Sequence, residues 1–306
     1  MEGLYQTNRV KTLKEKMVNE PRYVSIEQAR IITRVYQQNE DLSIPKRALS
    51  LKAALEELEI GVEKEELIVG NRTKGVRYGV VFPESGCSWV YNEIENLPYR
   101  PQDQFLVKEA DIQEFKEVIY PYWKGHSMED VIRHQYGQEI DAMAKVVKIN
   151  QKDHAQGHIC PDSKLWLELG PQGLIKKAQE KLKTCSKEHK EFYECTILVL
   201  QGACTFMRRY HDYIKEMLPH VESQYQATLQ TVADNCLHLS KRAPESFHEA
   251  LQSLWFLFVI LHMESNASSF SPGRIDQYLY PFYQKDKNAG IIDDQYALEL
   301  LECLWL

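Results

Sequence analysis

The sequence has few of the features that mark exported, membrane-spanning or disulfide-linked proteins. Its amino terminus lacks the basic and then apolar segments of a signal peptide, so export is not indicated. The uncharged apolar run Leu254–Leu261 is far too short to cross a bilayer. The seven cysteines are an odd number without CxxC spacing, which disfavours a disulfide framework or a ribbon-type zinc site. We therefore expect reduced thiols and a cytoplasmic location.

Several functional classes lack their signatures. The sequence contains no GxGxxG, P-loop, GxSxG or HExxH motif. Its formal charge is −7, and its 37 basic residues are spread among 44 acidic ones, which argues against nucleic-acid binding. What is present is typical of a soluble globular protein, with 43% hydrophobic and 26% charged residues in a chain long enough for a sizeable core.

The hydrophobic patterns predict a mostly helical protein. Ser25-Ile26-Glu27-Gln28 reads as a capping box that opens a helix through about Gln38, and Pro45 begins a second helix that runs to Leu58. Further helices are expected over about Leu174–Lys183, Glu188–Leu218, Glu222–Leu239, Glu245–Glu264 and from Ile292 to Leu306.

Strand signals are weaker. The best strand candidate is Glu65–Thr73, a short apolar run that ends in turn residues. The segment Gly75–Pro101 is predicted to be irregular, with Trp89 and Tyr91 packed on helices. Because no linker or repeat divides the chain, we treat residues 1–306 as one domain. A helical pattern that persists to Leu306 without a stop signal predicts an incomplete domain whose chain ends in mid-helix.

Small polar residues follow the apolar helix directly. Glu264–Arg274 supplies hydroxyls, an amide, a Pro-Gly turn and an arginine, and an aromatic cluster follows through Tyr283. Such side chains suit a buried polar pocket, but they also make ordinary turns. Arg274 and Asp276 have the chemistry of an anion clamp and a base, although an ion pair within the loop is the simpler interpretation. Tyr278, Tyr280 and Tyr283 are expected in the core.

A second informative stretch is Asp153–Asp162. His154, His158 and Cys160 are metal-ligand types, but Gly157 and Pro161 oppose the helix that would align the two histidines. We therefore predict no metal site there and no bound cofactor. A histidine hydrogen-bonded within a loop is the simplest alternative.

Several motifs, in order along all 306 residues, resemble the amino-terminal part of glycyl radical enzymes, which are pyruvate formate-lyase-like proteins. The glycerol and hydroxyproline dehydratase branch is the most similar. The matching segments are Leu67–Thr73, Pro83-Glu84, Arg100–Asp103, Tyr120–Gly125, Gly157-His158, and Glu264-Ser265-Asn266 continuing to Tyr283. The resemblance implies an α/β fold that is mostly helical here, with few strands of a ten-stranded barrel.

The resemblance also implies roles for individual residues. His158 would contact the leaving hydroxyl of the substrate as the catalytic residue, since an imidazole can donate or accept a proton there. Ser269 and Ser271 would bind a substrate hydroxyl. Asp162 follows the family pattern, whereas Ser163 stands where many relatives have tyrosine, which places the local pocket shape in question.

The radical-carrying loops of the family are absent from residues 1–306. These are an Arg-Val-x-Gly-Tyr-type loop with the radical glycine and a Gly-Cys-Val/Ile-Glu-type loop with the thiyl cysteine. Gly86-Cys87 is followed by Ser88-Trp89, so we do not assign Cys87 that role. The resemblance further implies an S-adenosylmethionine-dependent iron–sulfur activase as partner, a carboxy-terminal half that supplies the radical, and anaerobic chemistry.

Three hypotheses follow. The leading one is an amino-terminal fragment or subunit of a glycyl radical lyase or dehydratase for a small hydroxylated substrate, inactive alone. The second is a catalytically silent truncated protein, or a structural partner in a split enzyme. The third is a small-molecule binder that uses His158 and Ser269 without chemistry. A neighbouring reading frame that carries both missing loops would favour the first.

Overall fold

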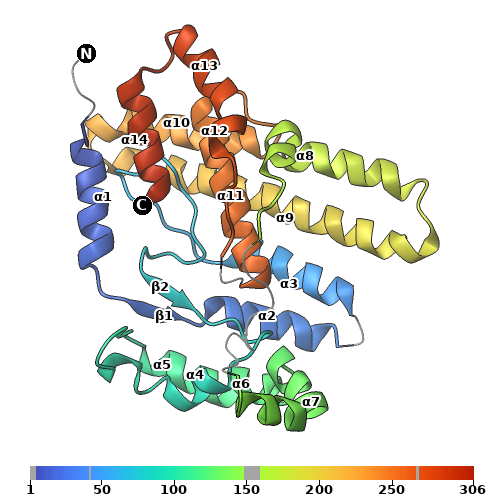
Figure 1. Cartoon of the computed structure of the whole chain (residues 1–306). Helices are drawn as coiled ribbons and strands as arrows, with labels where there is room; N and C mark the ends of the chain where they lie inside the picture. The colour runs from blue at the N-terminus through green and yellow to red at the C-terminus, as the bar shows by residue number, and fades with distance from the viewer. Residues whose placement is uncertain (1–4, 41–42, 148–158, 267–268) are drawn as a thin grey trace.

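The computed structural model describes residues 5–40, 43–147, 159–266 and 269–306 (Figure 1). Within these ranges the chain is mostly helical, with two short strands. The strands are β1 (Tyr23–Ser25) and β2 (Tyr78–Val80). The helices are α1 (Asn8–Asn19), α2 (Glu27–Gln38), α3 (Ile44–Glu57), α4 (Ser88–Glu93), α5 (Glu109–Glu114), α6 (Tyr120–Trp123), α7 (Met128–Ala144), α8 (Ser163–Leu182), α9 (Lys187–Met217), α10 (Ser223–Leu239), α11 (Phe247–Ser265), α12 (Ile275–Tyr278), α13 (Tyr280–Asn288) and α14 (Asp294–Trp305). The mostly helical prediction is confirmed.

Helix α11 lies at the centre of the larger core, in contact with α3, α8, α10, α13 and α14 (Figure 1). The Ser246 side chain caps its amino terminus by accepting a hydrogen bond from the Glu249 N–H, at 3.1 Å. Leu251, Leu254 and Phe256 are almost completely buried, as the apolar pattern predicts. This burial occurs within residues 1–306 themselves.

The predicted strand over Glu65–Thr73 is wrong. Leu67, Ile68 and Val69 are buried, yet their segment pairs with no strand among the described residues. Side chains of α11 bind its backbone instead: Gln252 accepts from the Val69 N–H at 2.8 Å and donates to the Val69 carbonyl at 2.6 Å. A single amide side chain therefore makes both bonds that a neighbouring strand would make.

Further bonds from α11 extend this clamp along the segment. His248 Nε2 lies 2.6 Å from the Leu67 carbonyl, and Trp255 Nε1 donates to the Gly70 carbonyl at 2.7 Å. Gly70 has a φ of +129°, a conformation that favours glycine. The apolar signal in this stretch thus reports burial against a helix, because apolar runs of this length do not distinguish a strand from other buried backbone.

A second, smaller core lies beside the first. It joins α2, the residues around β2, and α4 to α6, with Phe115, Ile119 and Trp123 deeply buried. β1 and β2 pair in parallel, with Tyr23 opposite Tyr78. The capping-box prediction is corrected here: Ser25 belongs to β1 and the cap residue of α2 is Ile26, which makes no side-chain cap bond.

Other boundaries differ from the sequence pattern. α8 begins at Ser163, well before Leu174, and continues through a kink at Gly170, where φ is +61°. The region predicted to be irregular contains β2 and α4. Trp89 and Tyr91 are 45% and 37% exposed, and Tyr91 stacks on Tyr120 of α6 with ring centroids 4.1 Å apart, so its predicted packing on a helix is confirmed. In the part of the chain described here, no helix combines the length and apolar composition needed to cross a membrane.

Candidate functional site

The polar loop leaves α11 through a left-handed residue. Asn266, the C-cap, has φ +48° and ψ +40°, a conformation that asparagine tolerates better than most side chains. Its N–H still donates to the His262 carbonyl at 3.0 Å. The chain therefore changes direction directly after the buried helix, and Ser269 and Ser271 follow within a few residues.

This loop pairs with the segment that follows His158 in the sequence. Ile159 and Phe270 form a parallel bridge: the Ile159 N–H donates to the Ser269 carbonyl at 3.4 Å, and the Ser271 N–H donates to the Ile159 carbonyl at 2.7 Å. Gly273 lies beside Cys160, because a Cβ built on Gly273 would sit 2.8 Å from the Cys160 Sγ. Two segments more than a hundred residues apart in sequence thus meet at the predicted site.

Of the predicted site residues, the structure describes Ser269 and Ser271 but not His158. Ser269 is partly buried, and Ser271 is exposed, with its hydroxyl accepting from the Gly273 N–H at 3.3 Å. His158 lies outside the described residues, although its neighbour Ile159 is in the bridge. His154 also lies outside the described ranges, and within them no three candidate ligands gather into a metal site. The assignments of His158, Ser269 and Ser271 remain predictions.

An aromatic pair borders the loop on the side of α11. The His262 ring lies edge-on to Phe270, with centroids 4.8 Å apart, and its Nδ1 donates to the Phe258 carbonyl at 2.8 Å. Burial lowers the pKa of His262. A neutral imidazole is therefore favoured beside the loop at neutral pH.

A polar network fixes the last turn of α11 from the side of α3. Arg47 Nε donates to Glu264 Oε1 at 2.9 Å, and Arg47 Nη1 lies 3.4 Å from Glu84 Oε1. The Tyr36 hydroxyl donates to the same Glu84 oxygen at 2.6 Å. Burial and the Glu84 carboxylate raise the pKa of Tyr36, so the hydroxyl stays protonated. Glu84 and Glu264 lie in segments that match the family, whereas Tyr36 and Arg47 lie in none.

Beyond the loop, Arg274 and Asp276 form the ion pair that the sequence allowed. Arg274 Nε and Nη2 donate to the two Asp276 oxygens at 3.0 and 2.9 Å. Both side chains are exposed, and the arginine holds the pKa of Asp276 well below its usual range. Tyr280 is also largely exposed, against expectation, because it lies on the outer side of α13.

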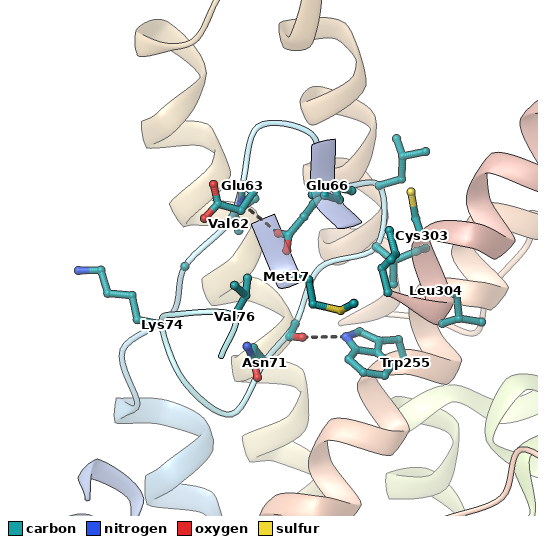
Figure 2. Close-up of a pocket in the computed structure, with 16 residues that line it drawn as sticks. Met17, Val62, Glu63, Glu66, Asn71, Lys74, Val76, Trp255, Cys303 and Leu304 are labelled. Atoms are coloured by element: carbon teal, nitrogen blue, oxygen red, sulfur yellow. Dashed lines mark hydrogen bonds between the residues drawn. The ribbon is translucent and has the colours of Figure 1, made fainter. Parts of the chain in front are cut away.

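A separate cavity of about 240 Å³ lies between α1, the Gly61–Val76 segment and the end of α14 (Figure 2). Met17, Glu66, Trp255 and Cys303 are among its lining residues, and none comes from the Ser269 loop. The protein around Glu66 keeps water from its carboxyl and raises its pKa to about 8, although part of the side chain still faces the cavity. No sequence motif predicts this cavity, since its walls come from four separate parts of the chain: α1, the Gly61–Val76 segment, α11 and the end of α14.

Burial disfavours the thiolate form of two cysteines. Burial raises the pKa of Cys87 and of Cys303, each to about 12. Cys204 is buried in α9, whereas Cys195 and Cys303 are only partly buried. Cys160 is exposed.

Comparison with known proteins identifies the fold. Residues 5–306 match the family model described as pyruvate formate lyase-like. The chain is 30% identical to (2S)-3-sulfopropanediol dehydratase from Klebsiella oxytoca, over 96% of this chain and 37% of that enzyme. It superimposes on the glycerol-bound B12-independent glycerol dehydratase from Clostridium butyricum with a TM-score of 0.93 and 32% identity, covering 99% of this chain and 40% of that one.

A second solved structure agrees. Hydroxyproline dehydratase from Clostridioides difficile, with trans-4-hydroxy-L-proline bound, matches with a TM-score of 0.92 and 29% identity, over 99% of this chain and 40% of that one. The chain thus spans about two fifths of the length of the relatives it matches. On the matched residues and the shared fold, the chain belongs to the pyruvate formate lyase-like family of glycyl radical enzymes.

Proposed function

We propose that residues 1–306 form the part of a glycyl radical dehydratase or lyase that binds a small hydroxylated substrate. The observation that carries this proposal is the bridge between Ile159 and Phe270, which ties the residue after His158 to the residue between Ser269 and Ser271. The relatives named above act on a sulfonated diol or are named for glycerol or hydroxyproline, so the shared feature is a hydroxylated small molecule.

In this proposal each residue has a distinct task. His158 donates a proton to the departing hydroxyl, while Ser269 and Ser271 hydrogen-bond a substrate hydroxyl and hold it in one orientation. The radical glycine and the hydrogen-abstracting cysteine come from polypeptide outside residues 1–306, and the radical supplies the homolytic step when present. An S-adenosylmethionine-dependent activase installs it.

The test uses residues 1–306 together with the polypeptide that carries the two radical loops, activated anaerobically. We expect a glycyl radical doublet by electron paramagnetic resonance in this preparation and none from residues 1–306 alone. In the active preparation, Ser269→Ala should lower kcat/KM for a diol or hydroxylated amino acid by about tenfold, the effect of one lost hydrogen bond to a neutral group.

A matched control is Thr196→Ala, which removes a hydroxyl of a half-buried side chain on α9 that donates to the Phe192 carbonyl of the same helix. Its kcat/KM should equal that of the parent enzyme. A doublet assigned to residues 1–306 alone would contradict the proposal that the radical glycine lies outside these residues. An unchanged kcat/KM in Ser269→Ala would show that this serine does not bind the substrate.

A second candidate is a catalytically silent or purely structural protein. A preparation that contains the radical but turns over none of the hydroxylated substrates would support it. Binding of such a substrate without turnover, measured by calorimetry, would point to the small-molecule binder.

A further inference from the structure

The last turn of α11 is bound by side chains from other parts of the chain. The final carbonyls of a helix have no partner within the helix. Gln28 Nε2, on α2, donates to the Met263 carbonyl at 2.7 Å, and Arg47 Nη2, on α3, donates to the Glu264 carbonyl at 3.1 Å. Two elements distant in sequence therefore satisfy carbonyls where the helix ends.

Arg72, in the loop before β2, completes this arrangement. Its Nη1 donates to Asn266 Oδ1 at 3.1 Å and its Nη2 donates to Gln28 Oε1 at 3.2 Å. Both partners are neutral amides, and burial lowers the pKa of Arg72 to about 10. The guanidinium still carries its charge at neutral pH, where the negative end of the α11 dipole favours it.

These bonds act on the residue that sets the direction of the loop. Asn266 is the left-handed C-cap, and its side chain is held by Arg72 while its N–H remains bonded to His262. A left-handed residue reverses the chain, so a change in its backbone angles displaces everything that follows. Ser269 is three residues further on.

The three side chains also lie where the two cores meet. Gln28 belongs to α2, whose Ile31 packs in the larger core and whose Ile32 packs in the smaller one. Arg47 contacts Glu84, which stands two residues after Phe82 of the smaller core, as well as Glu264. The end of α11 is thus hydrogen-bonded to side chains that come from elements of both cores.

We propose that Gln28, Arg47 and Arg72 are positioning residues that fix the end of α11 and the backbone of Asn266, and through them the place of the Ser269 hydroxyl. None of them needs to touch substrate. The effect of these residues on catalysis rests on the proposed function, but their effect on the position of the loop can be measured without any reaction.

The experiment is hydrogen–deuterium exchange of residues 1–306, read at peptides that cover Ser269–Ile275. Arg72→Met keeps the length of the side chain and removes both amide contacts. We expect exchange in these peptides to rise about tenfold, as one or two lost hydrogen bonds to a charged group allow the Ser271–Ile159 pairing to open. Arg72→Lys, which can serve one acceptor but not both, should give an intermediate rise.

The control is Arg209→Met. Arg209 makes the same kind of contact elsewhere, donating to the Leu55 carbonyl at 2.9 Å and to the Leu58 carbonyl at 2.5 Å at the end of α3. It should destabilise the chain to a similar extent in urea, yet leave exchange in Ser269–Ile275 unchanged.

Equal loosening of the loop by Arg72→Met and Arg209→Met would show a merely global effect and overturn the proposal, as would no change in Arg72→Met. The two proposals fail separately. If Arg72→Met loosens the loop while Ser269→Ala leaves kcat/KM intact in the complete enzyme, the positioning role stands and the proposed function fails.

Discussion

At the scale of single residues, the structure separates groups that are chemically alike. Arg274 ends the loop that begins at Asn266, and Arg72, from another segment, binds Asn266 at its start. Arg274 is exposed and paired with a carboxylate, whereas Arg72 donates to two neutral amides. An exposed pair contributes little to stability, while a buried guanidinium depends on each bond that it makes. Burial, rather than residue type, decides which arginine fixes the loop.

Glu66 provides a prediction at the same scale. Its pKa in the folded chain, about 8, exceeds its ordinary value of 4.5, so the folded state binds more protons than the unfolded state between these two values. The free energy of unfolding should therefore fall as pH rises from 5 to 8, by on the order of 2 kcal/mol after allowance for the exposed part of the side chain.

Glu66→Gln removes this titration and keeps an acceptor for the Glu63 N–H, which Glu66 Oε2 accepts from at 3.1 Å. Urea unfolding at pH 5.5, 7 and 8.5 should show a flatter pH dependence in the variant. Glu168→Gln, an exposed change on α8, should leave the slope unaltered. Parallel curves for the parent and Glu66→Gln would contradict a raised pKa.

At the scale of elements, α11 both fills the core and binds the backbone of a neighbouring segment. Gln252 is completely buried and satisfies both the N–H and the carbonyl of Val69. A buried amide is costly in an apolar helix unless it is fully bonded. Here the cost is offset because the Leu67–Val69 backbone would otherwise lack partners.

Gln252→Leu should accordingly destabilise the chain even though it makes α11 more apolar. Two buried backbone groups lose their partners, and we expect the free energy of unfolding to fall by about 2–4 kcal/mol. Urea titration followed by circular dichroism measures this. Gln224→Leu, exposed on α10, is the control and should shift the midpoint little. A neutral or stabilising Gln252→Leu would show that the clamp is dispensable.

At the scale of the whole molecule, helix α2 joins the two cores. Ile31 packs in the larger core, and Ala29, Ile32 and Tyr36 pack in the smaller one. Unfolding of α2 would therefore expose apolar residues of both cores. This arrangement favours cooperative unfolding of the two cores as one unit.

The corresponding prediction concerns exchange measured along a urea series. Peptides from α9–α11 and from α5–α6 should lose protection at the same urea concentration, because both cores depend on α2. Earlier loss in α5–α6, with α9–α11 still protected, would show that the smaller core unfolds independently.

Much of this architecture could be predicted from the sequence, and the failures share a physical cause. Helices such as α9 and α10 repeat an apolar stripe over many residues, so their boundaries agree with the predictions to within a residue or two. Glu65–Thr73 failed because burial against a helix leaves the same apolar pattern as burial in a sheet. The start of α8 was missed because Gly170 and Pro171, inside a kinked helix, resemble a helix end.

The candidate site was partly predictable for a similar reason. Ser269 and Ser271 could be selected because they follow a conspicuous helix and match a family motif. Gln28 and Arg47 match no family motif, and Arg72 lies in a matching segment but has no predicted role. The importance of all three comes from where folding places them, far from the loop in sequence. The pairing of Ile159 with Phe270 is likewise a product of tertiary structure.

The amide clamp of α11 has a consequence for how the chain tolerates substitution. Gln252 hydrogen-bonds the backbone N–H and carbonyl of Val69, and Trp255 Nε1 donates to the backbone oxygen of Gly70. Such hydrogen bonds do not depend on which side chain stands at position 69 or 70, but they require the particular side chain at position 252 or 255. In a saturation library, positions 67 to 69 should accept many apolar alternatives, whereas position 252 should accept almost nothing but glutamine.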